Sequence, residues 1–175
     1  MLIDFHANPG ALSPEAFAEA VKASGVDAVV ITCTNQAAGL EGYLDAVKNA
    51  GVKAYAGVEL AMERGAVVFV PTRDTKKFRK ADWAPEGDAW TREGIFNRLE
   101  DEKGATLSEH PYFRGGITPC SDRIYWMTKL DAVVTRVGRG KVSWDTLADQ
   151  AAEKMGLTRL GSAGSADHIG SAATI

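Results

Sequence analysis

Six residues with side chains capable of acid–base chemistry or metal binding stand at or just past the end of a segment that we expect to be a β-strand. They are His6, Cys33, Glu59, His110, Asp167 and His168, and they include every histidine of the chain. Imidazole, thiolate and carboxylate groups are the protein ligands of zinc, iron and manganese. If the strands are parallel, their carboxyl ends meet on one face and bring these side chains into a shared pocket.

Each of these residues taken alone has a simpler explanation. Glu59 can cap a turn, His110 can hydrogen-bond to a backbone carbonyl, and Asp167 can cap a helix. His6 and Asn8 are two residues apart, so in a strand they point to the same side, but one such pair also suits an ordinary strand end. The set as a whole favours a shared pocket over six unrelated positions.

The segments that would position these residues alternate along the whole chain. Strands are expected over residues 2–5, 28–32, 53–58, 66–70, 105–109, 132–136 and 158–162, and helices over residues 14–24, 40–50, 90–103, 121–129 and 143–155. Because parallel neighbours need crossover connections, this alternation predicts one α/β domain over residues 1–175 with mainly parallel strands. A complete eight-unit barrel takes about 250 residues, which leaves a small incomplete barrel or an open sheet.

The composition excludes several classes of protein. The 175 residues are 45% hydrophobic and 25% charged, as in one globular domain and unlike a disordered chain. No apolar run reaches the roughly 20 residues that span a bilayer, so no membrane partner is expected. The two cysteines are too few for a disulfide scaffold, and the chain opens without an export signal, so we expect a cytoplasmic protein.

The charge gives no general attraction to nucleic acid, because the net charge is -3. A basic cluster runs from Arg73 to Lys80 and is followed by Trp83 and Trp90. Such a cluster can contact an anionic backbone, but charged surface segments are usually only solvated. Nucleic acid is therefore not an expected partner.

Five short motifs follow one another in a recognisable order. They are His6-Ala7-Asn8, Thr32-Cys33-Thr34-Asn35, Gly57-Val58-Glu59, Glu109-His110-Pro111 and Gly164-Ser165-Ala166-Asp167-His168. In this order they resemble the motifs of the polymerase and histidinol phosphatase (PHP) family. The resemblance implies a distorted (β/α)7 barrel and a centre of two or three metal ions, commonly zinc, manganese or iron, that hydrolyses phosphate esters. It also implies that Glu59 would bridge metal ions.

The motifs depart from the family pattern at several ligand positions. The family's His-x-His is His6-x-Asn8 here, and its Thr-Asp-His is Thr32-Cys33-Thr34. The carboxylate of the closing Gly-Ser-Asp-x-His is displaced by one position, to Asp167. Amide and hydroxyl groups are weak substitutes for these ligands, so we expect about one ion rather than three. That ion would be held by His6, Glu59, His110 and either Asp167 or His168.

Three hypotheses follow. The first is a reduced metal-dependent phosphoesterase with one zinc, manganese or iron ion that acts on a small phosphorylated molecule, with Glu59, His110 and Asp167 as catalytic residues. Its substrate would lie against Asn8, Cys33, Thr34, Arg73, Arg114 and Arg136. The second is a catalytically inactive PHP-like pseudoenzyme that holds no metal and binds a small anion or a protein partner. The third makes Cys33 a nucleophile activated by His6 or His110. The residue types do not decide between the first two.

Overall fold

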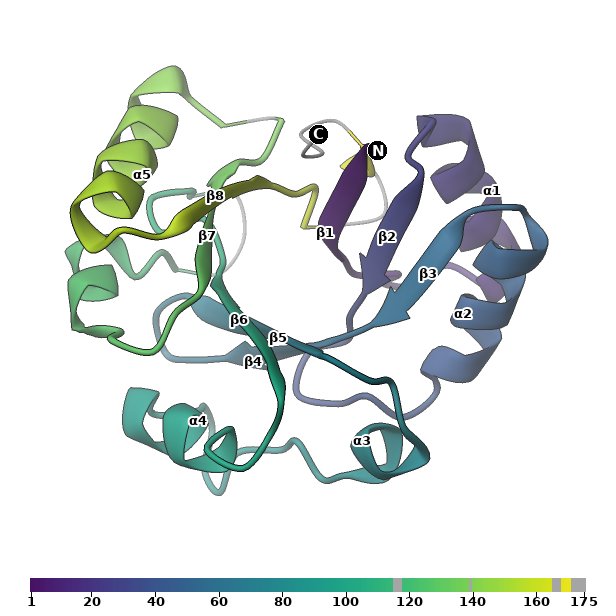
Figure 1. The fold of residues 1–175 in the computed structure, drawn as a ribbon, viewed down its shortest axis with the longest axis horizontal. Coiled ribbons are helices and arrows are strands. Elements are labelled where there is room, and N and C mark those ends of the chain that lie inside the picture. The colour runs from purple at the N-terminus through teal and green to yellow at the C-terminus, as the bar shows by residue number, and fades with distance from the viewer. Residues whose placement is uncertain (115–117, 139, 165–167, 171–175) are drawn as a thin grey trace.

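The computed structural model describes residues 1–114, 118–138, 140–164 and 168–170. Across these residues, strands surround the middle of the molecule and helices cover them on the outside (Figure 1). The strands are β1 (Ile3–Ala7), β2 (Ala28–Ile31), β3 (Lys53–Ala56), β4 (Val58–Ala61), β5 (Ala66–Pro71), β6 (Gly104–Ser108), β7 (Ala132–Arg136) and β8 (Thr158–Gly161). The helices are α1 (Pro14–Ser24), α2 (Leu40–Asn49), α3 (Lys76–Lys80), α4 (Arg92–Arg98) and α5 (Val142–Met155), with a 3-10 helix η1 (Ser121–Trp126).

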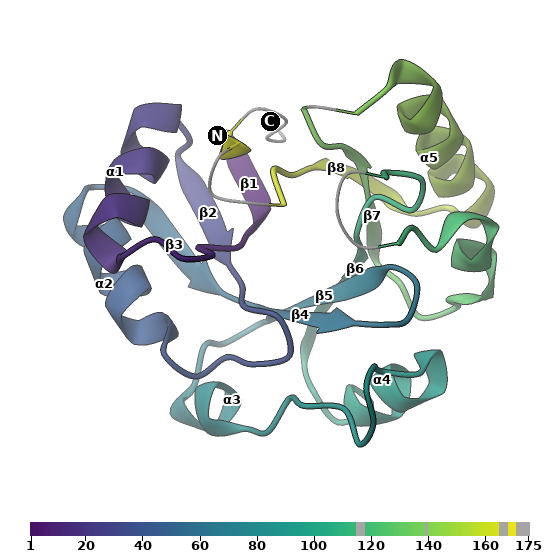
Figure 2. The same cartoon turned by 180° about the vertical axis from the view of Figure 1, so that it is seen from behind.

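The start and end of α1 follow from local sequence. The Ser13 hydroxyl accepts a hydrogen bond of 3.2 Å from the N–H of Ala16, and Pro14 stands in the first turn, where its missing N–H costs nothing. Gly25 ends the helix with φ 73°, a left-handed conformation that glycine adopts freely. Figure 2 shows α1 and α2 side by side on the outer side of the first three strands.

Two expected helices are shorter than the sequence pattern suggests. Of residues 90–103 only Arg92–Arg98 is α-helical, and of residues 121–129 only Ser121–Trp126 is helical, as a 3-10 helix. The charged residues after α4 offer no apolar face that would keep the helix on the core. Among the described residues, no helix is long and apolar enough to cross a membrane.

The strands form two sheets. The first has the order β1-β2-β3 with parallel neighbours, and the second has the order β4-β5-β6-β7-β8. In the second sheet β6, β7 and β8 are parallel, but β5 runs antiparallel to both β4 and β6. The predicted α/β class with parallel strands is confirmed, and the reversed direction of β5 is a feature that the strand pattern does not reveal.

The expectation of seven strands is corrected by a break at Gly57. A Cβ at this position would lie 3.0 Å from Cγ1 of Val30 and 3.1 Å from the carbonyl oxygen of Phe69, so any larger residue would crowd its neighbours. The break divides the expected strand over residues 53–58 into β3 and β4, which makes eight strands in the described ranges. Glu59, expected at the end of a strand, consequently lies within β4.

Strand pairing is interrupted between β3 and β4 and between β8 and β1, so the pairing does not close a barrel. At the first gap the N–H of Glu59 donates to the carbonyl of Cys33 at 3.2 Å, and the carbonyl of Glu59 accepts from the N–H of Asn35 at 2.7 Å. At the second gap the carbonyl of His6 accepts from the N–H of Gly164 at 2.9 Å and from the Ser162 hydroxyl at 2.8 Å. Hydrogen bonds therefore connect the chain across both gaps.

The gap between β8 and β1 also contains the fully buried carboxylate of Asp4. Its Oδ1 accepts hydrogen bonds of 3.2 Å from the Ser162 hydroxyl and from the N–H groups of His6 and Ala163. Its Oδ2 accepts a hydrogen bond of 3.0 Å from the N–H of Gly170. Asp4 therefore ties the first strand to two segments near the other end of the chain.

Apolar side chains fill both faces of the second sheet. Val68, Leu107, Ala132 and Leu160, from four neighbouring strands, form one buried cluster. The remaining core, which includes Phe17 of α1, is a larger cluster between the strands and the helices. The strands are covered on both faces, which explains their nearly continuous apolar sequences.

We expect Asp4→Ala to lower the free energy of unfolding by about 3 kcal/mol, because it leaves the backbone N–H groups of His6, Ala163 and Gly170 without their side-chain acceptor. Urea unfolding followed by circular dichroism measures the change. The matched control is Asp101→Ala at an exposed position, for which the expected change is within about 0.5 kcal/mol. Equal effects of the two substitutions would contradict the role assigned to Asp4.

Candidate functional site

A cavity of about 350 Å³ lies among the carboxyl ends of the parallel strands and the first part of β4. Its main polar side chains are those of His6, Asn8, Thr34, Glu59, Glu109 and His110. Its apolar side chains are those of Phe113, Pro119, Val134, Val137 and Ala163. The polar residues come mainly from β1, β4 and the segments after β2 and β6, and the apolar residues from β7 and the segments after β6, β7 and β8.

His6 lies between two carboxylates in the polar part of the cavity. Its Nδ1 is 2.8 Å from Oε1 of Glu109, and its Nε2 is 3.5 Å from Oε2 of Glu59. The second contact lacks hydrogen-bond geometry, so the buried Nε2 has no hydrogen-bond partner among the described residues. A buried ring nitrogen without a hydrogen-bond partner is uncommon, and in the neutral form of the ring its lone pair would be free to bind a further group.

The charge of His6 is set by the same two carboxylates. Burial by itself lowers the pKa of His6, but the negative charges of Glu109 and Glu59 and the close contact with Glu109 outweigh it and raise the pKa to about 10. In the metal-free chain the ring is therefore protonated at neutral pH.

Glu59 is held by donors from two further segments. The Thr34 hydroxyl donates to its Oε2 at 2.8 Å, and the Asn8 amide nitrogen lies 3.5 Å from the same oxygen. Burial raises the pKa of Glu59, but His6, Thr34 and Asn8 together bring it below its ordinary value, so the carboxyl group is ionised. Asn8 Oδ1 is already engaged, because it accepts a hydrogen bond of 3.0 Å from the N–H of Gly10.

Both ring nitrogens of His110 are hydrogen-bonded. Nδ1 accepts from the N–H of Tyr112 at 3.2 Å, which assigns the proton to Nε2, 3.0 Å from Oδ1 of Asp145. Burial lowers the pKa of His110 in spite of Asp145, so the ring is neutral at neutral pH. In this arrangement His110 lines the cavity without offering a free lone pair to a metal ion.

His6, Glu59 and Glu109 form a group whose chemistry fits a metal ion. One ligand atom of each residue lies within 4.8 Å of the others. Two ligand atoms that share a zinc ion at about 2.0–2.2 Å in a tetrahedral site are separated by roughly 3.5 Å, and Nε2 of His6 and Oε2 of Glu59 are 3.5 Å apart. An imidazole and two carboxylates also suit zinc, manganese or iron.

Five of the residues expected at a site line this cavity: His6, Asn8, Thr34, Glu59 and His110. Glu109 joins them, although the strand-end pattern pointed only to its neighbour His110. Glu109 directly follows β6, so the same strand-end rule could have predicted it as a lining residue. His168 does not belong to the lining, and Asp167 lies outside the described residues.

The direction of β5 carries Arg73 to the opposite end of the sheet. Pro71, at the end of β5, pairs with Gly104 at the start of β6. Glu109 follows the end of β6, and its N–H donates to the carbonyl of Ala66 at the start of β5. Arg73, which follows β5 and is exposed, therefore lies away from the cavity.

The other two arginines expected at the substrate do not line the cavity either. Nη2 of Arg136 lies 2.7 Å from Oδ2 of Asp149, and its Nε lies 3.9 Å from Oδ2 of Asp145, so α5 already balances this charge. Arg114 is exposed. The described lining of the cavity contains no arginine or lysine.

Cys33 is half-buried and is not among the lining residues. Burial raises the pKa of its thiol, and the negative charge of Glu59 raises it further. The thiol is therefore protonated at neutral pH, which weighs against an activated cysteine nucleophile.

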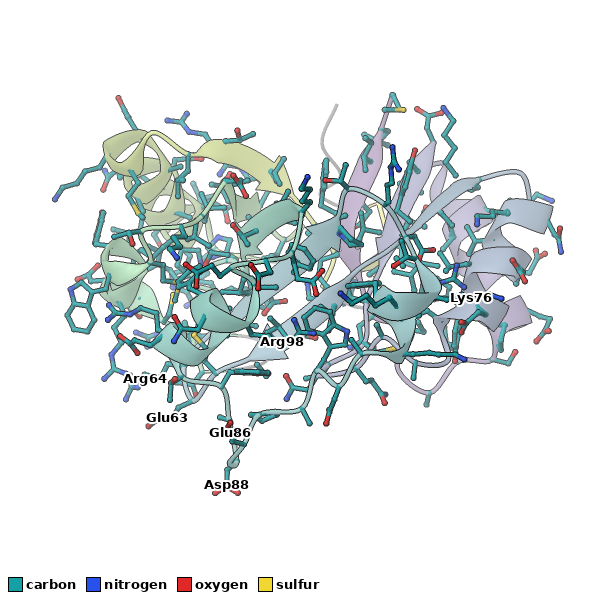
Figure 3. The ribbon with its side chains drawn as sticks, turned by 60° about the horizontal axis from the view of Figure 1, so that its bottom comes forward. Glu63, Arg64, Lys76, Glu86, Asp88 and Arg98 are labelled. Carbon is teal, nitrogen blue, oxygen red and sulfur yellow. The ribbon has the colours of Figure 1, made fainter. Side chains whose placement is uncertain are left out.

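Trp83 and Arg79, from the aromatic and basic residues expected at an anionic backbone, make contacts within the chain. Trp83 is 1% exposed, and the guanidinium of Arg98 lies 4.0 Å from the centre of its ring. Arg79 forms ion pairs of 2.7 and 3.2 Å with two carboxylates. Figure 3 shows Arg98 on this side of the molecule together with the acidic Glu86 and Asp88. The Trp83 ring thus already contacts Arg98, and the charge of Arg79 is already paired with carboxylates of the chain.

The sequence and the fold have known relatives. The family model of the PHP domain matches residues 4–112. The chain belongs to the PHP family. A comparison with curated protein sequences finds no match.

Three solved structures share the fold of this PHP domain at low sequence identity. PsfC from Pseudomonas syringae is 18% identical with a TM-score of 0.66, over 93% of this chain and 75% of that one. A candidate metal-dependent phosphoesterase from Bifidobacterium adolescentis is 10% identical with a TM-score of 0.72, over 94% and 87%. An amidohydrolase from Chromobacterium violaceum, with bound sulfate and no metal, is 12% identical with a TM-score of 0.69, over 91% and 86%.

The protonation of His6 predicts a pH dependence of stability in the chelator-treated protein. A pKa raised from 6.5 to about 10 stabilises the fold fully below pH 6.5, and this contribution is lost as the pH rises through about 10. Between pH 7 and 10 the free energy of unfolding should therefore fall by about 2–4 kcal/mol more in the natural chain than in His6→Gln. Urea unfolding at both pH values measures the difference, and equal losses in the two proteins would refute the assignment.

Iodoacetamide should modify Cys33 slowly at pH 7 and faster above pH 9, because the raised thiol pKa leaves little thiolate at neutral pH. Mass spectrometry of the labelled peptides assigns the site. Cys120 is an internal comparison: it is 3% exposed, burial raises its pKa to about 11, and it should react more slowly still. Rapid and selective labelling of Cys33 at neutral pH would restore the nucleophile hypothesis.

Proposed function

We propose that this PHP domain is a hydrolase of small phosphate esters that works with one divalent ion of zinc, manganese or iron. We also propose that residues 1–175 act as a single domain of the distorted (β/α) barrel type. The observation that carries the proposal is the buried Nε2 of His6, which lacks a hydrogen-bond partner in the described chain and lies 3.5 Å from Oε2 of Glu59.

His6 and Glu59 are the proposed direct ligands of the ion. Glu109 has a different proposed role, because its Oε1 is 2.8 Å from Nδ1 of His6 and can hold the proton of the neutral ring there. That hydrogen bond would keep the lone pair of Nε2 directed toward Glu59. A carboxylate that orients a metal-bound histidine in this way is common in metalloproteins.

Asn8 and Thr34 support one ion rather than two or three. Both direct donor groups at Oε2 of Glu59, and the oxygen of Asn8 is taken by the N–H of Gly10. They therefore position the carboxylate instead of adding ligands to it. His110 would need to release the N–H of Tyr112 before Nδ1 could bind an ion.

The bound ion would supply Lewis acidity to a phosphoryl oxygen and to the attacking water. The residues of the chain have three tasks around it. His6 and Glu59 hold it, and Glu109 keeps the His6 proton on Nδ1. Thr34 and Asn8 fix the Glu59 carboxylate by hydrogen bonds, so that its oxygens need not reorganise during the reaction. The apolar side chains of the cavity limit access of water to the ester.

A second candidate is a pseudoenzyme that binds a small anion without metal. The hydrogen bonds from Thr34 and Asn8 favour it, because they satisfy Glu59 in the absence of any ion. The charge of the cavity opposes it: the described lining has two glutamates and one protonated histidine, and no arginine or lysine. An anion would find little attraction there unless a metal ion were present.

Protein purified without chelators, and the same protein titrated with Mn²⁺ or Zn²⁺, should bind about one ion per chain and hydrolyse an aryl phosphate ester. Glu59→Gln should abolish both the metal binding and the hydrolysis, because it removes a charged ligand. Glu109→Gln should weaken metal binding by about 10- to 100-fold, because it removes only the charge that orients His6. Calorimetry and elemental analysis measure the binding.

The control for these substitutions is Glu86→Gln at an exposed position, which should leave both properties unchanged. Absence of metal binding together with tight binding of inorganic phosphate would favour the pseudoenzyme. Binding of two or more ions per chain would overturn the single-ion arrangement.

A further inference from the structure

The cavity has little positive charge with which to hold a phosphate group. Its described lining contains the carboxylates of Glu59 and Glu109 and neither arginine nor lysine. Both ring nitrogens of His110 are already hydrogen-bonded within the chain, Nε2 to Asp145 and Nδ1 to the N–H of Tyr112. One divalent ion would balance the two carboxylates and leave the site close to neutral.

Arg136 and Arg73, two arginines of the described residues that were expected at the substrate, do not correct this balance. Arg136 is paired with Asp149 and lies close to Asp145, and Arg73 is at the other end of the sheet. A phosphate monoester carries about two negative charges at neutral pH, whereas a diester carries one. The second charge of a monoester would enter a half-enclosed site without a partner there, which costs free energy.

Part of the cavity lining is apolar and well packed. Val134 is 2% exposed and Val137 6% exposed, and both lie at the end of β7. The ring of Phe113 makes an edge-to-face contact with Trp144, with ring centres 6.0 Å apart. Such a wall gains free energy by covering an aryl or alkyl group and gains nothing from a hydroxylated or charged one.

From the charge balance and the apolar wall together we propose that the site acts on phosphate diesters with an apolar organic group, in preference to phosphate monoesters. This inference rests on the proposed function and adds a substrate class to it. Each turnover consumes one water: a bond forms between phosphorus and the water oxygen, and the bond to one ester oxygen breaks. The leaving oxygen keeps the bonding electron pair and takes up a proton from solvent, and the proton released from water passes to solvent. The products are an alcohol and a monoester, whose extra charge favours its release.

Three substrates with the same leaving group test the inference. They are bis(4-nitrophenyl) phosphate, methyl 4-nitrophenyl phosphate and 4-nitrophenyl phosphate, and each releases coloured 4-nitrophenolate. With the metal-loaded protein, we expect kcat/KM divided by the uncatalysed rate to be about tenfold or more higher for bis(4-nitrophenyl) phosphate than for the monoester. Methyl 4-nitrophenyl phosphate should lie between them, because it has the single charge but a smaller apolar group.

Val137→Lys should raise the rate on the monoester relative to the diester by about tenfold, because it places a cation in the cavity. Its matched control is Val142→Lys, at an 80% exposed position on α5, which should leave the ratio unchanged. Phe113→Ala provides a second variant that adds no buried charge. It should raise KM for bis(4-nitrophenyl) phosphate several-fold and leave KM for methyl 4-nitrophenyl phosphate nearly unchanged.

The outcomes separate this inference from the function on which it rests. Faster hydrolysis of the monoester by the natural chain would overturn the substrate class, while the turnover itself would still support a metal-dependent phosphoesterase. An equal effect of Phe113→Ala on both diesters would remove the role of the apolar wall. Metal-loaded protein that hydrolyses none of the three substrates would overturn both proposals.

Discussion

The buried carboxylate of Asp4 is the constraint on which the arrangement of the site depends. Strand pairing is absent between β8 and β1, so backbone N–H groups at this gap need other acceptors. Asp4 accepts hydrogen bonds from His6, Ala163 and Gly170 and thereby joins both ends of the chain. The N–H of His6 is one of these donors. The hydrogen bond to Asp4 therefore helps to fix the backbone position from which the imidazole projects.

A second constraint is the pair of hydrogen-bond donors that hold the Glu59 carboxylate. Where the family motifs carry histidines, Asn8 and Thr34 direct an amide and a hydroxyl at the same carboxylate oxygen. These donors lower the pKa of Glu59 against the effect of its burial and fix its orientation. The carboxylate is thus ionised and held in one orientation without an ion. Its position in the cavity does not depend on a full metal cluster.

Much of this site could be predicted from sequence because strand ends converge. His6 lies near the end of β1 and His110 follows β6, and both line the cavity, which is the outcome expected for parallel strands. The position of Arg73 could not be read in this way, since β5 is antiparallel. The short connection from Ala61 to Ala66 carried that information, because only a hairpin can join neighbouring strands over so few residues. The role of Asp4 stayed hidden because the donors in Ser162, Ala163 and Gly170 lie more than 150 residues away from it in sequence.

The single-ion arrangement has a further chemical consequence for the ester bond. In two-metal sites the second ion stabilises the negative charge that develops on the leaving oxygen. In the described lining of this cavity the side chains of Phe113, Val134 and Val137 would offer that oxygen neither charge nor a hydrogen bond. His110 cannot supply a proton from its present position, because its Nε2 faces Asp145. In the proposed reaction the leaving group would therefore carry this charge itself, which would favour esters of relatively acidic alcohols such as phenols.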